Sequence, residues 1–141
     1  MRVIIGYGNE LRGEDAFGVD VIKELQKLLL KETKLISVFQ LTPEIVLELL
    51  DTDEIIFIDS YYSQENHYAL ACSLTEQNGL NLSHHISPKT IIYMLNGLYN
   101  RDPKFYIYSM MTNSFDEIMD LKRYKKCGDV VVKHLLKLSL D

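Results

Sequence analysis

The sequence predicts an α/β fold: a three-layer sandwich with a mostly parallel, five-stranded twisted sheet and helices on both faces. Short apolar, β-branched runs alternate along the chain with segments of helical periodicity. Such alternation is typical of parallel strands joined by crossover helices. The runs at 3–5 and 55–58 are continuously apolar, as in strands buried on both faces. The weakly alternating segment 68–74 is expected to be an edge strand, which can run antiparallel to the others.

The first half of the chain continues this alternation of strand and helix. Residues 15–30 carry apolar side chains at helical spacing, with charged residues on the opposite face. A second strand is predicted at 35–39. A Thr-Pro-Glu sequence at 42–44 then opens a helix that continues to residue 50. Threonine can cap this helix, proline fits its first turn, and glutamate favours its positive end.

The second half begins with the strand at 54–59, in which the apolar run ends in Asp59. A helix over 90–99 is expected to start with Ser87 as its cap and Pro88 as its first residue. A further strand is predicted at 104–110, and a terminal helix covers 129–138.

Composition narrows the class of protein. The 141 residues are expected to form a single domain, residues 1–141, with a hydrophobic core. The net charge of -5 argues against a nucleic-acid-binding surface, and no apolar run is long enough to span a bilayer. Cys72 and Cys127 form no metal motif and favour free thiols in a reducing compartment. We therefore expect a cytoplasmic protein with no nucleic-acid or membrane partner.

The turn after the first strand is predicted to present carboxylates at the edge of the sheet. Gly6 and Gly8 suit a sharp bend or a close approach of the backbone, and Glu14 and Asp15 lie where the strand passes into the helix. A dinucleotide-binding turn would need a third glycine where Leu11 stands, and adjacent acids would repel a phosphate. The turn is therefore expected to offer carboxylates to a cation rather than amides to a phosphate.

Three loops together offer the atoms of a metal site: Glu14 and Asp15 in the first, Asp59 in the second, and His84 and His85 in the third. The loops after the first and third strands share one edge of a parallel sheet, where ligands bind. Carboxylates with an imidazole suit a divalent transition metal with open coordination positions, which hydrolytic chemistry needs. Structural explanations stay open, because the acids can also cap a helix or a turn and the histidines can form a surface pair.

The remaining reactive side chains show no catalytic pattern. His67 and His134 have no partner in the sequence pattern and are expected to be structural or exposed to solvent. No serine lies in a nucleophile-elbow motif, and no motif surrounds either cysteine. The three loops therefore remain the candidate site.

Four segments resemble the hydrogenase maturation proteases, the endopeptidases that trim the C-terminus of the large subunit of nickel–iron hydrogenases. Residues 6–15, GYGNELRGED, are similar to the family's opening motif Gly-x-Gly-Asn-x-Leu-x-Gly-acid-acid, and 56–59 are similar to its third strand with the terminal acid. Residues 40–44 and 84–88 resemble the branch that serves soluble, bidirectional-type hydrogenases. The resemblance covers residues 1–110.

The resemblance implies that Asp15, Asp59 and His84 are both the catalytic residues and the metal ligands, with His85 as the alternative to His84. It implies hydrolysis of a peptide bond in a large-subunit precursor, which is the expected partner of a monomeric enzyme. It further implies that this substrate supplies the nickel, and that other divalent metals can occupy the site in purified protein. Recognition of the nickel would tie removal of the C-terminal extension to correct metal loading.

The sequence departs from the family pattern in the opening motif and in a late loop. Glu14 stands where aspartate is usual and Ala16 where glycine is common, which removes no candidate ligand. In the late loop Ile118 replaces a glycine, and Leu121-Lys122 replaces a Leu-Ser pair. We expect these late changes to alter the loop and a docking surface without touching the proposed metal site.

Two other functions stay open. A receiver-like signalling domain also has acids after its first strand and an aspartate at the end of its third. Against it, Glu14 lies well beyond the strand end and no lysine follows the strand at 105–108. The second is a non-catalytic metal-binding or chaperone relative of the protease, which would bind the precursor without cleaving it. Only the altered late loop favours that alternative.

Overall fold

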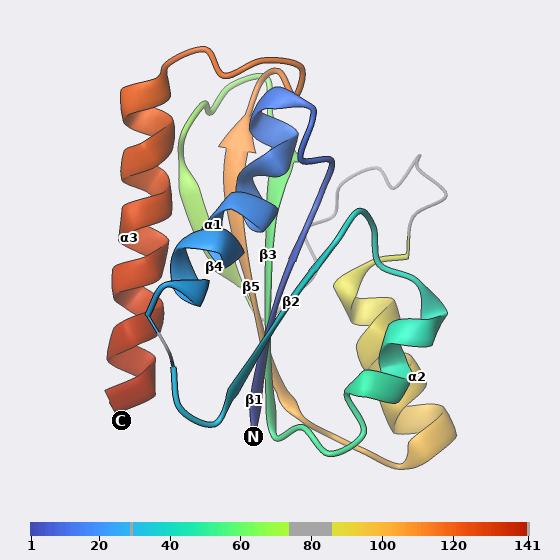
Figure 1. Ribbon diagram of the computed structural model, residues 1–141. Coiled ribbons are helices and arrows are strands. Elements are labelled where there is room, and N and C mark those ends of the chain that lie inside the picture. The colour runs from blue at the N-terminus through green and yellow to red at the C-terminus, as the bar shows by residue number, and fades with distance from the viewer. Residues whose placement is uncertain (29, 74–85, 141) are drawn as a thin grey trace.

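The computed structural model describes residues 1–28, 30–73 and 86–140, and these residues form one five-stranded sheet with helices around it (Figure 1). Across the sheet the strands are β2 (Thr33–Val38), β1 (Arg2–Tyr7), β3 (Glu54–Tyr62), β5 (Lys104–Thr112) and β4 (Leu70–Ser73). The pairs β1–β2, β1–β3 and β3–β5 are parallel, whereas the edge strand β4 is antiparallel to β5. The predicted fold class is therefore confirmed, including the antiparallel edge strand.

Helices cover both faces of this sheet (Figure 1). On one face lie α1 (Phe17–Gln26) and α3 (Leu121–Leu140), which contact each other. On the other lie α2 (Pro88–Tyr99) and a short 3-10 helix, η2 (Pro43–Glu48). No helix in the described part of the chain combines the length and the apolarity needed to cross a membrane.

An apolar cluster on each face holds the layers together, and β1 contributes to both. Ile4 packs in the cluster beneath α1 and α3, whereas Val3 and Ile5 pack in the cluster beneath α2 and η2. All three side chains are completely buried. Because successive side chains of a strand point to opposite faces, a strand covered on both sides must be apolar at every position. This requirement explains the continuous apolar runs in the sequence.

Several element boundaries differ from the predicted ones. A separate 3-10 turn, η1 (Gly13–Ala16), precedes α1, which ends at Gln26 rather than at residue 30. The helix predicted at 42–50 is the 3-10 helix η2. The terminal helix α3 begins at Leu121 rather than at 129.

The strand β3 is longer than predicted, so Asp59 lies inside it and not at its end. The pairing of β3 with β5 continues to Tyr62 and Thr112, beyond the last residue that pairs with β1. The prediction was wrong here because hydrogen bonding to a neighbouring strand, rather than apolar character, extends β3.

The start of α2 follows the sequence prediction. Ser87 is the residue before the helix, and its side-chain oxygen accepts a hydrogen bond from the Thr90 amide at 3.2 Å. Pro88 occupies the first helical position, where its missing N–H leaves no bond unmade.

Glycines allow α1 to begin in direct contact with the sheet. A Cβ atom at Gly18 would lie 2.2 Å from the carbonyl oxygen of Ile58 on β3. At Gly6 on β1, a Cβ atom would lie 2.1 Å from the carbonyl oxygen of Gly18. Even an alanine at either position would therefore push the helix away from the end of the sheet that carries Asp59.

This contact predicts that Gly18→Ala destabilises the protein, because the added methyl group meets backbone that cannot move independently. We expect a loss of about 1–3 kcal/mol in the free energy of unfolding, measured by urea denaturation. Gly97→Ala is the matched control, since it lies within α2 and a Cβ there meets no atom within 4 Å. It should stabilise by roughly 0.5–1 kcal/mol. Equal effects of the two changes would contradict the proposed close contact.

The two cysteines should differ in reactivity, because Cys72 is exposed and Cys127 is buried, both as free thiols. Burial raises the pKa of Cys127, which lowers the fraction of reactive thiolate. A thiol reagent such as Ellman's reagent should label Cys72 in the native protein and Cys127 only after unfolding. Labelling of both at the same rate would contradict the burial of Cys127.

Candidate functional site

Asp59 lies on β3 near the carboxyl ends of the parallel strands, between β1 and β5. The hydroxyl of Ser109, its register partner on β5, donates to Oδ1 at 2.5 Å. The hydroxyl of Tyr7, the last residue of β1, donates to Oδ2 at 2.5 Å. The side chain is therefore fixed from both neighbouring strands.

The electrostatic surroundings of Asp59 place a second carboxylate beside it. Burial raises the pKa of Asp59 to about 6; the hydrogen bonds from Ser109 and Tyr7 oppose this rise, and the negative charge of Asp15 adds to it. The two acids therefore interact electrostatically.

Asp15 is held in the turn between β1 and α1. The Asn9 amide donates to its Oδ2 at 3.0 Å, and its own amide donates to the Arg12 carbonyl at 2.9 Å. Gly8 has a φ of 144°, and a Cβ atom there would lie 2.0 Å from the Asp15 carbonyl oxygen. Because only glycine fits at position 8, the Gly-x-Gly-Asn part of the motif positions the Asp15 side chain.

The side chain of Glu14 points into the interior, so the expectation that it offers atoms for a metal site is wrong. Its side chain is completely buried. It accepts hydrogen bonds from the Thr112 hydroxyl at 2.6 Å, from the Met119 amide at 3.1 Å and from the Tyr68 hydroxyl. Its Oε1 also lies 2.8 Å from Nε2 of His67. With all its oxygens engaged in the interior, Glu14 neither faces a ligand nor caps α1.

These contacts decide the charge state of Glu14. Burial raises its pKa, but the hydrogen bonds from Thr112, Tyr68, His67 and the Met119 amide outweigh that effect and hold the pKa below its ordinary value. A carboxylate that accepts several hydrogen bonds is stable in its charged form even without water around it. Glu14 is therefore a structural anion.

The histidines outside the predicted site are structural, as expected, but both have partners that the sequence did not indicate. His67 contacts Glu14 and stacks on the ring of Tyr68, with 3.9 Å between the ring centroids. Nδ1 of His134 on α3 lies 3.0 Å from the Tyr108 hydroxyl on β5. His67 and Glu14 are 53 residues apart in sequence, so no local pattern could have revealed their contact.

The late loop, residues 113–120 between β5 and α3, packs directly on the turn that carries Asp15. Arg12 Nε donates to Asp116 at 2.8 Å, and the Asp15 amide lies 3.4 Å from the Phe115 carbonyl oxygen. The loop therefore contacts the backbone of a candidate ligand through Phe115, whereas the expectation that the changes at Ile118 and Leu121-Lys122 leave the metal site untouched stays a prediction. Ile118, which stands where glycine is usual, packs against the apolar cluster beneath α1 and α3.

The third predicted ligand, His84 or its alternative His85, lies outside the described residues. Within residues 1–28, 30–73 and 86–140, no three histidine, cysteine or acidic side chains gather closely enough to hold a metal ion. Of the predicted ligands, the structure describes Asp15 and Asp59, and the charge of Asp15 acts on Asp59. The complete ligand set remains a prediction.

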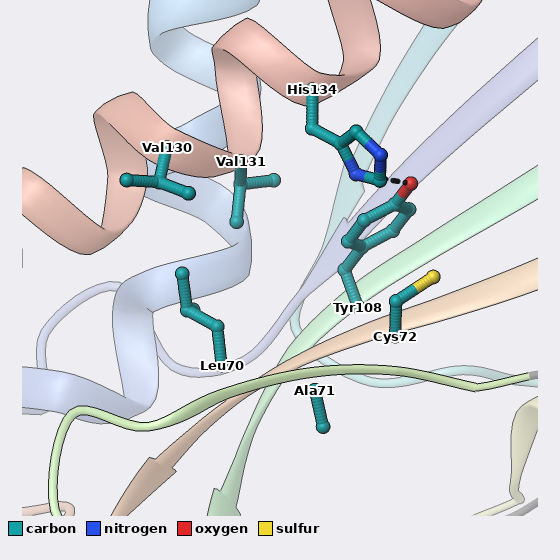
Figure 2. A pocket seen from close by; sticks show the side chains of 7 residues that line it. All are labelled: Leu70, Ala71, Cys72, Tyr108, Val130, Val131 and His134. Atoms are coloured by element: carbon teal, nitrogen blue, oxygen red, sulfur yellow. Dashed lines mark hydrogen bonds between the residues drawn. The ribbon is translucent and has the colours of Figure 1, made fainter.

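A separate hollow of about 140 Å³ lies between β4 and α3 (Figure 2). Its walls are mainly apolar, and the hydroxyl of Tyr108 points to His134 across one side. The residues that line this hollow are Leu70, Ala71, Cys72, Tyr108, Val130, Val131 and His134. None of them is a predicted metal ligand.

Comparison with solved structures shows this fold in hydrogenase maturation proteases. The protein matches the [NiFe] hydrogenase maturation protease HycI from Thermococcus kodakarensis with a TM-score of 0.72 and 18% identity, over 94% of this chain and 90% of that chain. It matches the hydrogenase-maturating endopeptidase HybD from E. coli with a TM-score of 0.75 and 16% identity, over 97% and 90%. For the hydrogenase 2 maturation peptidase from a Thaumarchaeota archaeon the values are 0.71 and 20%, over 99% of both chains.

No family model and no curated protein matches the sequence. The structural likeness confirms the resemblance to hydrogenase maturation proteases at the level of the fold. The resemblance to the branch serving soluble, bidirectional-type hydrogenases stays a prediction.

The burial of Glu14 predicts that Glu14→Gln destabilises the protein by about 2–4 kcal/mol, because donors to a charged acceptor lose their partner. Glu10→Gln is the control, since Glu10 is exposed and pairs only with Lys23 at the surface among the described ion pairs; it should change stability by less than about 0.5 kcal/mol. The measurement is urea denaturation at pH 7.

The same pair of variants gives a pH dependence. The pKa of Glu14 is lower in the folded protein than in the unfolded chain. Its contribution to the free energy of unfolding is therefore fully present above the unfolded-state pKa and is lost as the pH falls through the folded-state pKa. The stability difference between wild type and Glu14→Gln should therefore shrink in acid. A difference that grows as the pH falls would contradict the charged, hydrogen-bonded state of Glu14.

Proposed function

We propose that this protein is an endopeptidase that removes the C-terminal extension of a nickel-loaded hydrogenase large-subunit precursor. The observation that carries the proposal is the carboxylate of Asp59, fixed by Tyr7 and Ser109 at the carboxyl edge of the sheet, with Asp15 held in the neighbouring turn by the Asn9 amide and its charge acting on Asp59. These two acids occur in a fold that is shared with hydrogenase maturation endopeptidases. In open α/β sheets this edge is where ligands bind.

The donor atoms of the site fit a divalent cation brought in by the substrate. Each oxygen of Asp59 accepts one hydrogen bond and keeps a further lone pair for a cation. The repulsion between Asp15 and Asp59, which contributes to the raised pKa of Asp59, is relieved when a cation lies between them. His84, or His85 in its place, would add an imidazole, and this mixed set suits nickel better than carboxylates alone.

Tyr7 and Ser109 would orient Asp59 toward the precursor's nickel. They donate to different oxygens of the carboxylate, so its plane is set before substrate arrives. Removing a residue that fixes a metal ligand in this way typically costs about 10–100-fold in metal affinity or activity.

The paired acids also explain how cleavage would depend on nickel loading. A precursor that carries nickel offers the positive charge that Asp15 and Asp59 lack. A precursor without nickel would dock against two carboxylates that repel each other, and would leave this repulsion uncompensated. Binding, and therefore hydrolysis of the bond before the C-terminal extension, would then favour the loaded precursor.

The receiver-like alternative is less well supported. The aspartate of a receiver-like domain ends its third strand, whereas Asp59 lies inside β3, which continues to Tyr62. The residue beside it on β5 is Ser109, not a lysine that would bind a phosphoryl group. The non-catalytic alternative corresponds to a protein that binds the precursor without cleaving it.

We place the reaction in the cytoplasm, where the free thiols of Cys72 and Cys127 would remain reduced. The proposed partner is the large-subunit precursor, and the proposed acting form is a monomer.

The proposal predicts that Asp15→Ala, Asp59→Ala and His84→Ala each lower processing of the nickel-loaded precursor by roughly 100-fold or more, because each removes a proposed ligand. Processing is measured from the mass of the precursor over time. Asp51→Ala is the control, since this aspartate is fully exposed in the segment before β3. Normal processing by all three site variants would overturn the proposal.

A further inference from the structure

The buried carboxylate of Glu14 gathers segments that lie far apart in the chain. Among the described residues, its donors are Thr112 at the end of β5, the Met119 amide before α3, and His67 and Tyr68 before β4. We call these residues, with Glu14 itself, the Glu14 cluster. They come from positions 53 to 105 residues away from Glu14 in sequence.

A second layer of hydrogen bonds continues from this cluster into the late loop. The Tyr68 hydroxyl accepts a hydrogen bond from the Asp120 amide at 2.7 Å. The Thr112 hydroxyl oxygen accepts one from the Ser114 amide at 3.1 Å. The loop is therefore anchored at both of its ends to groups that bind the Glu14 carboxylate.

The late loop in turn touches the turn that carries Asp15. Beyond the Arg12–Asp116 ion pair, Gly13 has a φ of 43° and a Cβ atom there would lie 2.4 Å from Cα of Glu117. The Asp15 amide faces the Phe115 carbonyl oxygen at 3.4 Å. In Figure 1 the turn before α1 and the loop before α3 meet at the same end of the sheet. A shift of the loop would therefore shift the backbone of Asp15.

We propose that Glu14 is a positioning residue, which holds the late loop on the opening turn so that the adjacent Asp15 is presented to the substrate's nickel. This inference rests on the proposed function and extends it. The acids of the motif divide their roles: Glu14 points inward and fixes the two loops, whereas Asp15 lies at the edge of the sheet with Asp59. The late loop becomes a support for a ligand as well as a surface.

The test compares Glu14→Gln and Thr112→Val with the conservative Thr112→Ser, which keeps the donating hydroxyl. Glu14→Gln and Thr112→Val should lower kcat for cleavage of the nickel-loaded precursor by roughly 10–100-fold, with KM changed less than about threefold. Thr112→Ser should recover most of kcat.

A purely structural effect would act through loss of folded protein, so a destabilised variant remote from the cluster is needed. Leu49→Ala removes a completely buried side chain between η2 and β3. All variants are assayed well below their melting temperatures. Wild-type kcat in Glu14→Gln and Thr112→Val, or an equal loss of kcat in Leu49→Ala, would overturn the inference.

Hydrogen exchange separates this inference from the proposed function, because it needs no precursor. In Glu14→Gln the amides of residues 9–15 and 113–120 should exchange at least about tenfold faster than in wild type, and those in Leu49→Ala should not. If wild type cleaves no precursor, the proposed function fails, and exchange alone decides whether Glu14 holds these loops. Unchanged exchange in Glu14→Gln would overturn the inference.

Discussion

The hydrogen bonding of one buried carboxylate constrains the whole carboxyl edge of this protein. Burying an ionised glutamate is strongly unfavourable unless donors replace the water it loses. For Glu14 those donors come from the segment before β4, the end of β5 and the loop before α3. The positions of these segments therefore depend on the turn after β1, which carries Glu14. The fold is fixed by its apolar clusters, and this edge by a polar interaction.

The consequence for the site is that two adjacent acids have opposite surroundings. Glu14 is fully buried and satisfied, whereas Asp15 is held by the Asn9 amide and lies near Asp59. Asp59 is in turn oriented by Tyr7 and Ser109 from the neighbouring strands. A sheet edge built in this way offers two oriented carboxylates, and under the proposed function a cation on a docking protein would complete the arrangement.

Sequence patterns predicted those parts of the structure that local physics controls. The apolar runs of β1 and β3 follow from burial on two faces, and the Ser87 cap follows from hydrogen bonding within one turn. Parallel topology predicted that the turn with Asp15 and the strand with Asp59 share one edge of the sheet, and the charge of Asp15 does act on Asp59. The extension of β3 to Tyr62 depends on pairing with β5, and the contact of His67 with Glu14 spans 53 residues. Neither could be predicted from a local sequence pattern. His84 and His85 lie outside the described residues, and their role rests on the resemblance.

The most direct test of the account is a cleavage measurement on the natural class of substrate. The purified protein is mixed with the hydrogenase large-subunit precursor from the same source, with and without loaded nickel, and the precursor is weighed by mass spectrometry. The account predicts a loss of mass at the C-terminus only when nickel is present. Cleavage that is equally fast without nickel, or binding with no cleavage under either condition, would contradict it.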